Sequence, residues 1–182
     1  MKTQDLLRCS LFTALIAVGA FIKVPVPVVP FTLQFFFTTL AGLLLGPKLG
    51  TISVTAYVVL GLVGLPIFTE GGGFWYVLKP SFGYLLGFCV GTFVTGWLSE
   101  RWNGGFGRDL AANLAGLAVV YAMGMGYYSW ICSHVLGSPI GLWPLILYCF
   151  LLAVPGDLVL SLLAAGLARR LRPIVAGQVA KN

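Results

Sequence analysis

Apolar stretches alternate with short breaks rich in glycine, proline or charge along the whole chain, and this pattern predicts an all-α integral membrane protein. A helix needs roughly 20 apolar residues to cross a bilayer. We expect six spanning helices in a single transmembrane domain of residues 1–182, at residues 6–22, 33–45, 50–65, 80–98, 110–134 and 142–171. The last is long, so we expect it to tilt and to bend near Pro155, whose ring removes a backbone donor.

Composition agrees with this interpretation. The chain has 182 residues, of which 59% are hydrophobic and 9% charged, whereas about a quarter of the residues of a soluble domain are charged. The four cysteines share no C-x-x-C spacing, which indicates packing residues rather than a disulfide or zinc framework. Residues 6–22 are followed by Lys23-Val24-Pro25 and not by a small-residue cleavage site, which favours a retained span over a signal peptide.

The basic residues predict the orientation. With both termini in the cytoplasm, all of the 11 lysines and arginines except Lys23 and Lys79 lie on the inner side, and the flipped topology reverses this bias. The net charge of +6 is explained by this asymmetry. No basic run is interleaved with aromatic residues, so nothing indicates nucleic acid binding.

Asp157 is the one charged residue between Asp109 and Arg169. A carboxylate in hydrocarbon costs about 2.5–3.5 kcal/mol on insertion scales, so Asp157 is expected to face a protein interior or a wet cavity. Such a residue is a candidate for a substrate, ion or proton site. The alternative is a structural aspartate that binds neighbouring backbone amides beside Pro155.

Two outer loops have unusual compositions. Residues 24–32 contain three prolines, which predicts a stiff extended strap. Residues 66–79 contain three consecutive glycines between aromatic residues and end at Lys79, a composition typical of a hinged flap over an apolar ligand. A small molecule that is anionic at one end and forms hydrogen bonds at the other would satisfy both Lys79 and Asp157. The alternatives are a flexible loop with interfacial aromatics and a lysine that only snorkels to the interface.

Several function classes lack their motifs. The chain has no P-loop, HExxH or GxSxG sequence and no cluster of histidines and carboxylates, which disfavours an enzyme and predicts neither a metal nor a cofactor. A proton-coupled secondary carrier for a small anionic nutrient stays open, although such carriers usually have more intramembrane polar groups and related halves. One central site without a motor favours a binding subunit that takes its energy from a partner.

Five segments of the chain closely resemble the BioY family: residues 18–34, 41–50, 61–68, 83–88 and 155–158. BioY proteins are biotin-specific substrate-binding subunits (S components) of energy-coupling-factor (ECF) transporters. The resemblance implies a six-helix fold in the cell membrane of a bacterium and capture of biotin at the extracellular side. It also implies two kinds of partner, a transmembrane coupling subunit and two cytoplasmic ATPases.

The chain departs from the family at two places. The family commonly has a lysine three residues after the aspartate, where this chain has Leu160, and a Gly-Pro-Thr-Gly-Gly sequence where this chain has residues 79–83. We therefore expect Lys79 to supply the charge that Leu160 cannot. Asp157 is expected to accept hydrogen bonds from the ureido group of biotin, and Lys79 to meet its carboxylate.

The remaining candidate residues follow from the same resemblance. Phe31, Trp75 and Tyr84 are expected to pack on the thiophane ring and the aliphatic chain of biotin, and Gln34 to form a hydrogen bond with an amide-like group. The alternative for each aromatic residue is plain helix packing.

The first span offers a face for the coupling subunit. Ser10 and Ala14 have the small-xxx-small spacing that lets helices approach closely in lipid, and Ala17 and Val18 follow on the next turn. The alternative is packing of this face within the helical bundle itself.

Overall fold

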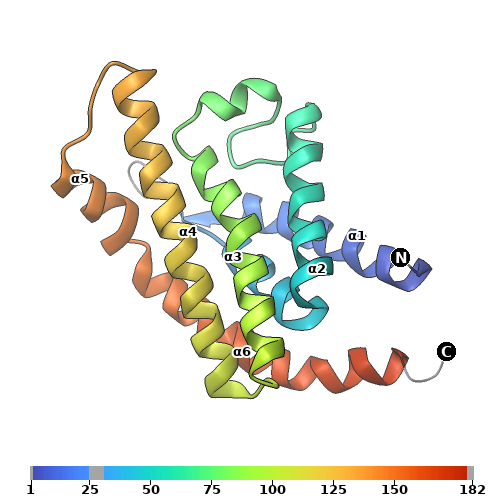
Figure 1. The fold of residues 1–182 in the computed structure, drawn as a ribbon. Coiled ribbons are helices and arrows are strands. Elements are labelled where there is room, and N and C mark those ends of the chain that lie inside the picture. The colour runs from blue at the N-terminus through green and yellow to red at the C-terminus, as the bar shows by residue number, and fades with distance from the viewer. Residues whose placement is uncertain (1, 25–30, 180–182) are drawn as a thin grey trace.

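The computed structural model describes residues 2–24 and 31–179 and is almost entirely helical (Figure 1). Its helices are α1 (Thr3–Phe21), α2 (Gln34–Val63), α3 (Phe82–Arg101), α4 (Phe106–His134), α5 (Leu142–Ile146) and α6 (Val154–Val179). The short segments are the 3-10 helix η1 (Phe74–Leu78), the π-helical η2 (Leu147–Leu151) and an antiparallel pair of strands, β1 (Lys23–Val24) and β2 (Phe31–Thr32). Most of the expected proline-rich strap lies outside the described residues.

Within the described residues, five helical segments are long and apolar enough to cross a membrane. They are Thr3–Phe21, Gln34–Val63, Phe82–Arg101, Phe106–His134 and Leu142–Pro173. The expected number of six is not confirmed, because the second and third expected spans belong to one helix, α2, that is kinked within its length.

The kink in α2 lies at Gly46, whose φ of 77° and ψ of −179° are not helical. A side chain is strained at positive φ, and Pro47 can begin the following helical turn because its missing N–H would have no partner there. The expected turn at these two residues is thus present, but the helix resumes at once instead of after a loop.

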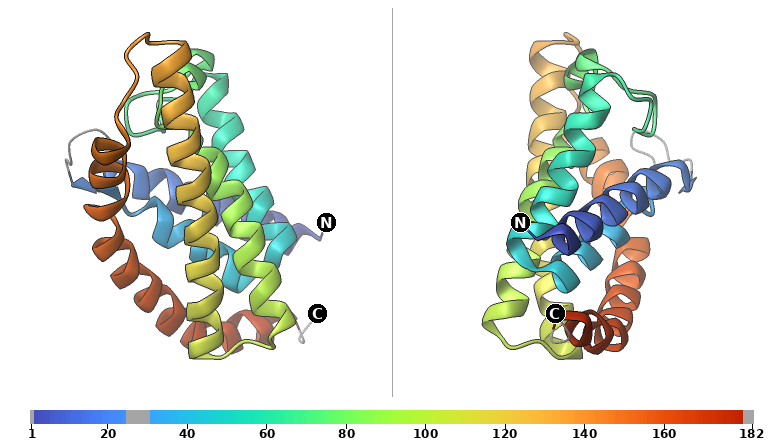
Figure 2. Two further views of the ribbon diagram at one scale, coloured as in Figure 1. Left: turned by 60° about the vertical axis from the view of Figure 1, so that its left-hand side comes forward. Right: turned by 90° about the vertical axis from the view of Figure 1, so that its right-hand side faces the viewer.

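The second half of α2 lies beside α3, which packs in turn on α4, and α1 crosses these helices at a steep angle (Figures 1 and 2). A Cβ atom on Gly87 of α3 would lie 3.0 Å from the backbone of Val120 on α4, closer than most Cβ atoms come to a neighbour. Small residues let helices come into backbone contact in this way, which gains dispersion energy where lipid offers no hydrophobic driving force.

The last spanning segment is not one continuous helix. α5 and η2 end before Leu152 and Ala153, where the chain turns, and α6 begins at Val154. Pro155 then lies in the first turn of α6, so the bend expected near this proline is present. α6 descends beside α4, and its C-terminal part passes close to the α3–α4 turn, where the Arg172 side chain reaches Gly104 (Figure 2).

Candidate functional site

A cavity of about 70 Å³ lies where β2, the first turn of α2, α3, α4, η2 and α6 meet. Its walls are mainly aromatic and aliphatic, with hydroxyl, amide and carboxylate groups among them. The lining residues are Phe31, Thr32, Gln34, Phe35, Thr69, Tyr76, Ser81, Tyr84, Leu85, Phe88, Leu117, Val120, Tyr121, Tyr148, Cys149, Ala153 and Asp157. An apolar cavity with a few converging polar groups is the usual form of a small-molecule site.

Asp157 lies in the first turn of α6 and is 8% exposed. Tyr121 of α4 donates a 2.5 Å hydrogen bond to its Oδ2 atom, and the other carboxylate oxygen has no hydrogen-bond partner among the described residues. Within the same residues the carboxylate accepts no bond from a backbone amide, unlike the arrangement expected of a purely structural aspartate. Because Asp157 lines the cavity, its carboxylate has capacity to accept a hydrogen bond from a ligand.

Gln34, the first residue of α2, is held by hydrogen bonds to two other side chains. Its Nε2 atom donates to the Tyr57 hydroxyl over 2.7 Å, and the Thr32 hydroxyl donates to its Oε1 atom over 3.2 Å. The amide nitrogen carries two N–H groups, so these bonds fix the orientation of the side chain and leave it one donor.

Two of the expected aromatic residues line the cavity. Tyr84 is buried and donates to the Cys149 carbonyl over 3.1 Å, which fixes its ring against η2. Phe31 packs on Gly156, where a Cβ atom would collide with the phenyl ring. The glycine next to Asp157 therefore makes room for an aromatic wall beside the carboxylate.

Lys79 and Trp75 do not line the cavity. The Lys79 ammonium forms a 2.6 Å ion pair with Glu70 and lies 5.0 Å from the centre of the Tyr76 ring. Trp75 is 79% exposed, whereas Tyr76, its neighbour in η1, is buried and shares a 3.0 Å hydrogen bond with Thr69. The tight turn of η1 thus points the next aromatic residue, and not Trp75, toward the cavity.

The expected flap, residues 66–79, is closed against the helices. Phe68 is 1% exposed and fills the space beside Gly61, where a side chain would collide with its ring. The Gly73 N–H donates to the Gly61 carbonyl over 2.7 Å. Gly71 and Gly73 have φ values of 108° and 105°, which other residues rarely adopt, so the glycines permit this path.

Sequence reasoning missed Tyr121, Tyr76 and Tyr148, which line the cavity with their neighbours. A signal existed for Tyr121, because a phenol in the middle of an apolar span needs a hydrogen-bond partner. Periodicity could not show that this partner is Asp157, which is 36 positions away.

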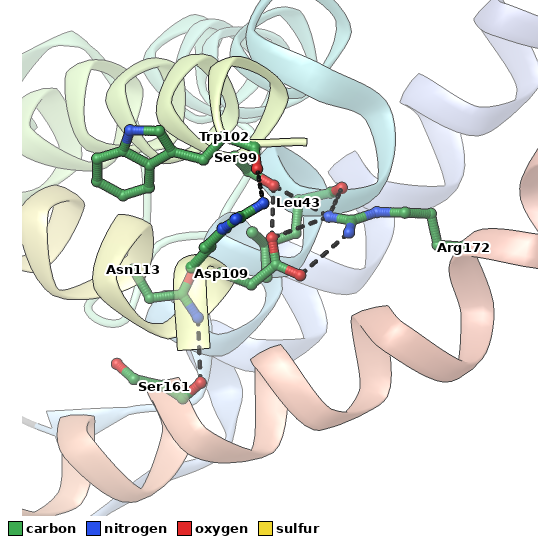
Figure 3. Close-up of polar contacts among 8 residues, drawn as sticks. Leu43, Ser99, Trp102, Asp109, Asn113, Ser161 and Arg172 are labelled. Carbon is green, nitrogen blue, oxygen red and sulfur yellow. Dashed lines mark hydrogen bonds and ion pairs between the residues drawn. The ribbon is translucent and has the colours of Figure 1, made fainter. Parts of the chain in front are cut away.

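A second buried carboxylate, Asp109 (Figure 3), does not line the cavity. Its side chain is 0% exposed. The carboxylate accepts hydrogen bonds from both terminal nitrogens of Arg172 over 3.1 Å and from the Ser99 hydroxyl over 2.6 Å. Arg172 also donates to the Leu43 carbonyl, so one guanidinium joins α2, α3, α4 and α6. The start of α4 is thus enclosed by three other helices, which bury Asp109 although it lies near the end of a predicted span.

Between the cavity and this ion pair, α4 and α6 share another polar contact. Asn113 donates to the Ser161 carbonyl over 3.0 Å (Figure 3). The Ser161 hydroxyl donates to the Asp157 carbonyl over 2.8 Å. Each of these groups would be costly to bury in lipid without a partner. Polar contacts thus fix the register of α4 and α6 from the cavity to the opposite end.

The proposed docking face of α1 is accessible in the isolated chain. Ser10, Ala14 and Val18 are exposed, and Ala17 is half-buried. The Ser10 hydroxyl donates to the Leu6 carbonyl within the same helix, and it bonds to no other helix among the described residues.

Comparisons with known proteins extend along nearly the whole chain. A model described as "BioY family" matches residues 1–177. A "Probable biotin transporter BioY" of Lysinibacillus sphaericus is 42% identical over 93% of this chain and 87% of its own. A "Biotin transporter BioY" of Thermotoga maritima is 46% identical over 67% of this chain and 72% of its own.

The fold also matches a crystal structure, that of the "S-component for biotin from an ECF-type ABC transporter". The TM-score is 0.83 and the identity 31%, over 94% of this chain and 92% of that one. At this identity the likeness extends beyond the fold to the family.

Proposed function

The chain belongs to the BioY family, and on that premise we propose that it is the biotin-binding membrane subunit of an ECF-type importer. The subunit captures biotin at the extracellular side, and a transmembrane coupling subunit with two ATPases drives uptake. The proposal rests on the cavity around Asp157, together with the likeness to a biotin S component. No catalytic role is part of it.

The proposal includes a topology. The two halves of α2 count as separate spans, which gives six, and both termini lie in the cytoplasm of a bacterial cell. Hydropathy and the uneven distribution of lysine and arginine support this arrangement.

The chemistry of the cavity suits biotin. The ureido ring offers two N–H donors, and the free capacity of the Asp157 carboxylate is to accept. Tyr84 and Phe31 offer aromatic surface to the thiophane ring and the aliphatic chain, and Gln34 offers its remaining N–H group. Trp75 is 79% exposed and does not line the cavity, so its proposed contact with the ligand is limited to the outer edge of the site.

We expect Asp157→Asn to weaken biotin binding. The amide presents a donor where the ureido ring also donates, so a charge-assisted bond is lost at a cost of about 1.5–3 kcal/mol, roughly 10-fold or more in affinity. Equilibrium binding of labelled biotin to the purified variants measures the effect. Ser133→Ala, a substitution of an exposed serine of α4, is the control and should leave the affinity unchanged. Unchanged affinity in folded Asp157→Asn would exclude the carboxylate from the site.

We also propose that Lys79 contributes positive charge at the mouth of the cavity. Its ion pair with Glu70 is about half-exposed, so the ammonium could exchange this partner for the carboxylate of an arriving ligand. Lys79→Ala should then reduce affinity for biotin more than affinity for the neutral biotin amide. Equal losses for the two ligands would limit Lys79 to a role in the structure of the flap. If Lys79 supplies the charge that relatives place at the position of Leu160, then Leu160→Lys should restore biotin binding in the Lys79→Ala variant.

A further inference from the structure

The cavity contains no positive charge to receive an anionic ligand. Among the described residues, its lining includes no lysine, arginine or histidine, and its one charged group is the Asp157 carboxylate. Biotin carries a carboxylate at neutral pH, which needs a hydrogen-bonding cation or water when the ligand is enclosed. The cation must therefore come from the rim.

Lys23 joins the two segments that form this rim. In the β1–β2 pair it lies opposite Thr32, a residue of the cavity wall. Its ammonium donates to the carbonyl of Thr69, another residue of the wall, over 3.0 Å. Residues directly opposite in an antiparallel pair direct their side chains to the same face, so Lys23 reaches across the edge of the cavity from strand to flap.

Lys23 forms no ion pair with a described residue. The chain has five carboxylate side chains, all at described positions, and the two ion pairs join Lys79 to Glu70 and Arg172 to Asp109. Within the described part of the chain, the Lys23 ammonium has only the Thr69 carbonyl as a partner, and an ammonium can donate three hydrogen bonds. Lys23 therefore has both charge and donors to offer.

We propose that Lys23 is a specificity-determining residue that binds the carboxylate of the ligand at the rim of the cavity. This inference rests on the proposed function, because it takes biotin as the ligand. The position of Lys23 on the outer side, against the general bias of the basic residues, then has a functional reason. The Thr69 contact keeps the ammonium beside the entrance until the ligand arrives.

The test compares biotin with its neutral amide on purified full-length protein. Displacement of labelled biotin gives the affinity of each ligand for the wild type and for Lys23→Ala, Lys23→Gln and Lys23→Arg. The proposed pair of the Lys23 ammonium and the ligand carboxylate lies at the exposed rim, where salt screens it. We therefore expect Lys23→Ala and Lys23→Gln to reduce the affinity for biotin about 5-fold and the affinity for the amide less than about 2-fold. Lys23→Arg keeps the charge and most of the affinity. Lys48→Ala, a lysine next to the α2 kink, is the matched control and binds both ligands as the wild type does.

Three results would overturn the assignment. Equal losses for the two ligands would make Lys23 a clip between strand and flap. A charge-dependent loss confined to Lys79→Ala would make Lys79 the cation instead. A wild type that binds biotin and its amide equally would exclude any cation, even if the Lys23 variants failed to fold. A wild type that does not bind biotin would contradict the proposed function itself and is recognised before any variant is made.

Discussion

Ser10→Trp and Ala14→Trp are expected to leave biotin binding by the isolated subunit intact and to abolish ATP-driven uptake by the assembled transporter. Both residues lie on the exposed face of α1, and neither lines the cavity. Small side chains there allow another helix to approach closely in lipid, and an indole prevents this approach. Ala17 and Val18 extend the same face. Uptake of labelled biotin by cells that contain the coupling subunit and ATPases, with binding to the purified variants in parallel, measures both effects.

Leu163→Trp is the control, because Leu163 is an exposed residue of α6 and the substitution places the same indole on another helix. It should spare both uptake and binding. Uptake that survives both α1 substitutions would move the docking face elsewhere. If biotin binding also fails in those variants, the face packs within the subunit and not against a partner.

Arg172→Ala is expected to lower the free energy of unfolding by about 3–5 kcal/mol, the range for breaking a buried ion pair by removing one partner. The substitution leaves the fully buried Asp109 carboxylate with the Ser99 hydroxyl as its remaining side-chain partner. Asp109→Asn should cost less, because the Arg172 side chain is 35% exposed and can be hydrated when its partner is lost. Unfolding of the purified variants in detergent micelles ranks the two effects.

Arg170→Ala is the control for this comparison, because Arg170 is an exposed neighbour on the same helix. It should change stability little. An Arg172→Ala variant as stable as Arg170→Ala would show that the ion pair does not hold the four helices together.

Hydropathy located most of the helices, because a spanning helix is a local property of about 20 successive residues. It also identified Asp157, since a carboxylate in such a stretch needs a partner or a cavity. The kink at Gly46 was visible as turn chemistry. Its consequence, one interrupted helix instead of two, depends on the φ angle of a single glycine and could not be read from composition.

The rest of the site depends on contacts between distant positions. Asp109 and Arg172 are 63 residues apart, and each looks like an ordinary charge near a helix end. Tyr121 could not be paired with Asp157 without knowing how α4 lies against α6. In the flap, the choice between Trp75 and Tyr76 is made by one step of the 3-10 helix, a finer distinction than aromatic composition allows.

The central claim is that this chain, without partners, binds biotin in the cavity around Asp157. Equilibrium binding of labelled biotin to the purified protein in detergent or nanodiscs tests it most directly, with other small vitamins as competitors. We expect saturable binding with one site per chain, which unlabelled biotin displaces and the other vitamins do not. Absence of saturable binding by folded protein, or equal displacement by unrelated vitamins, would contradict it.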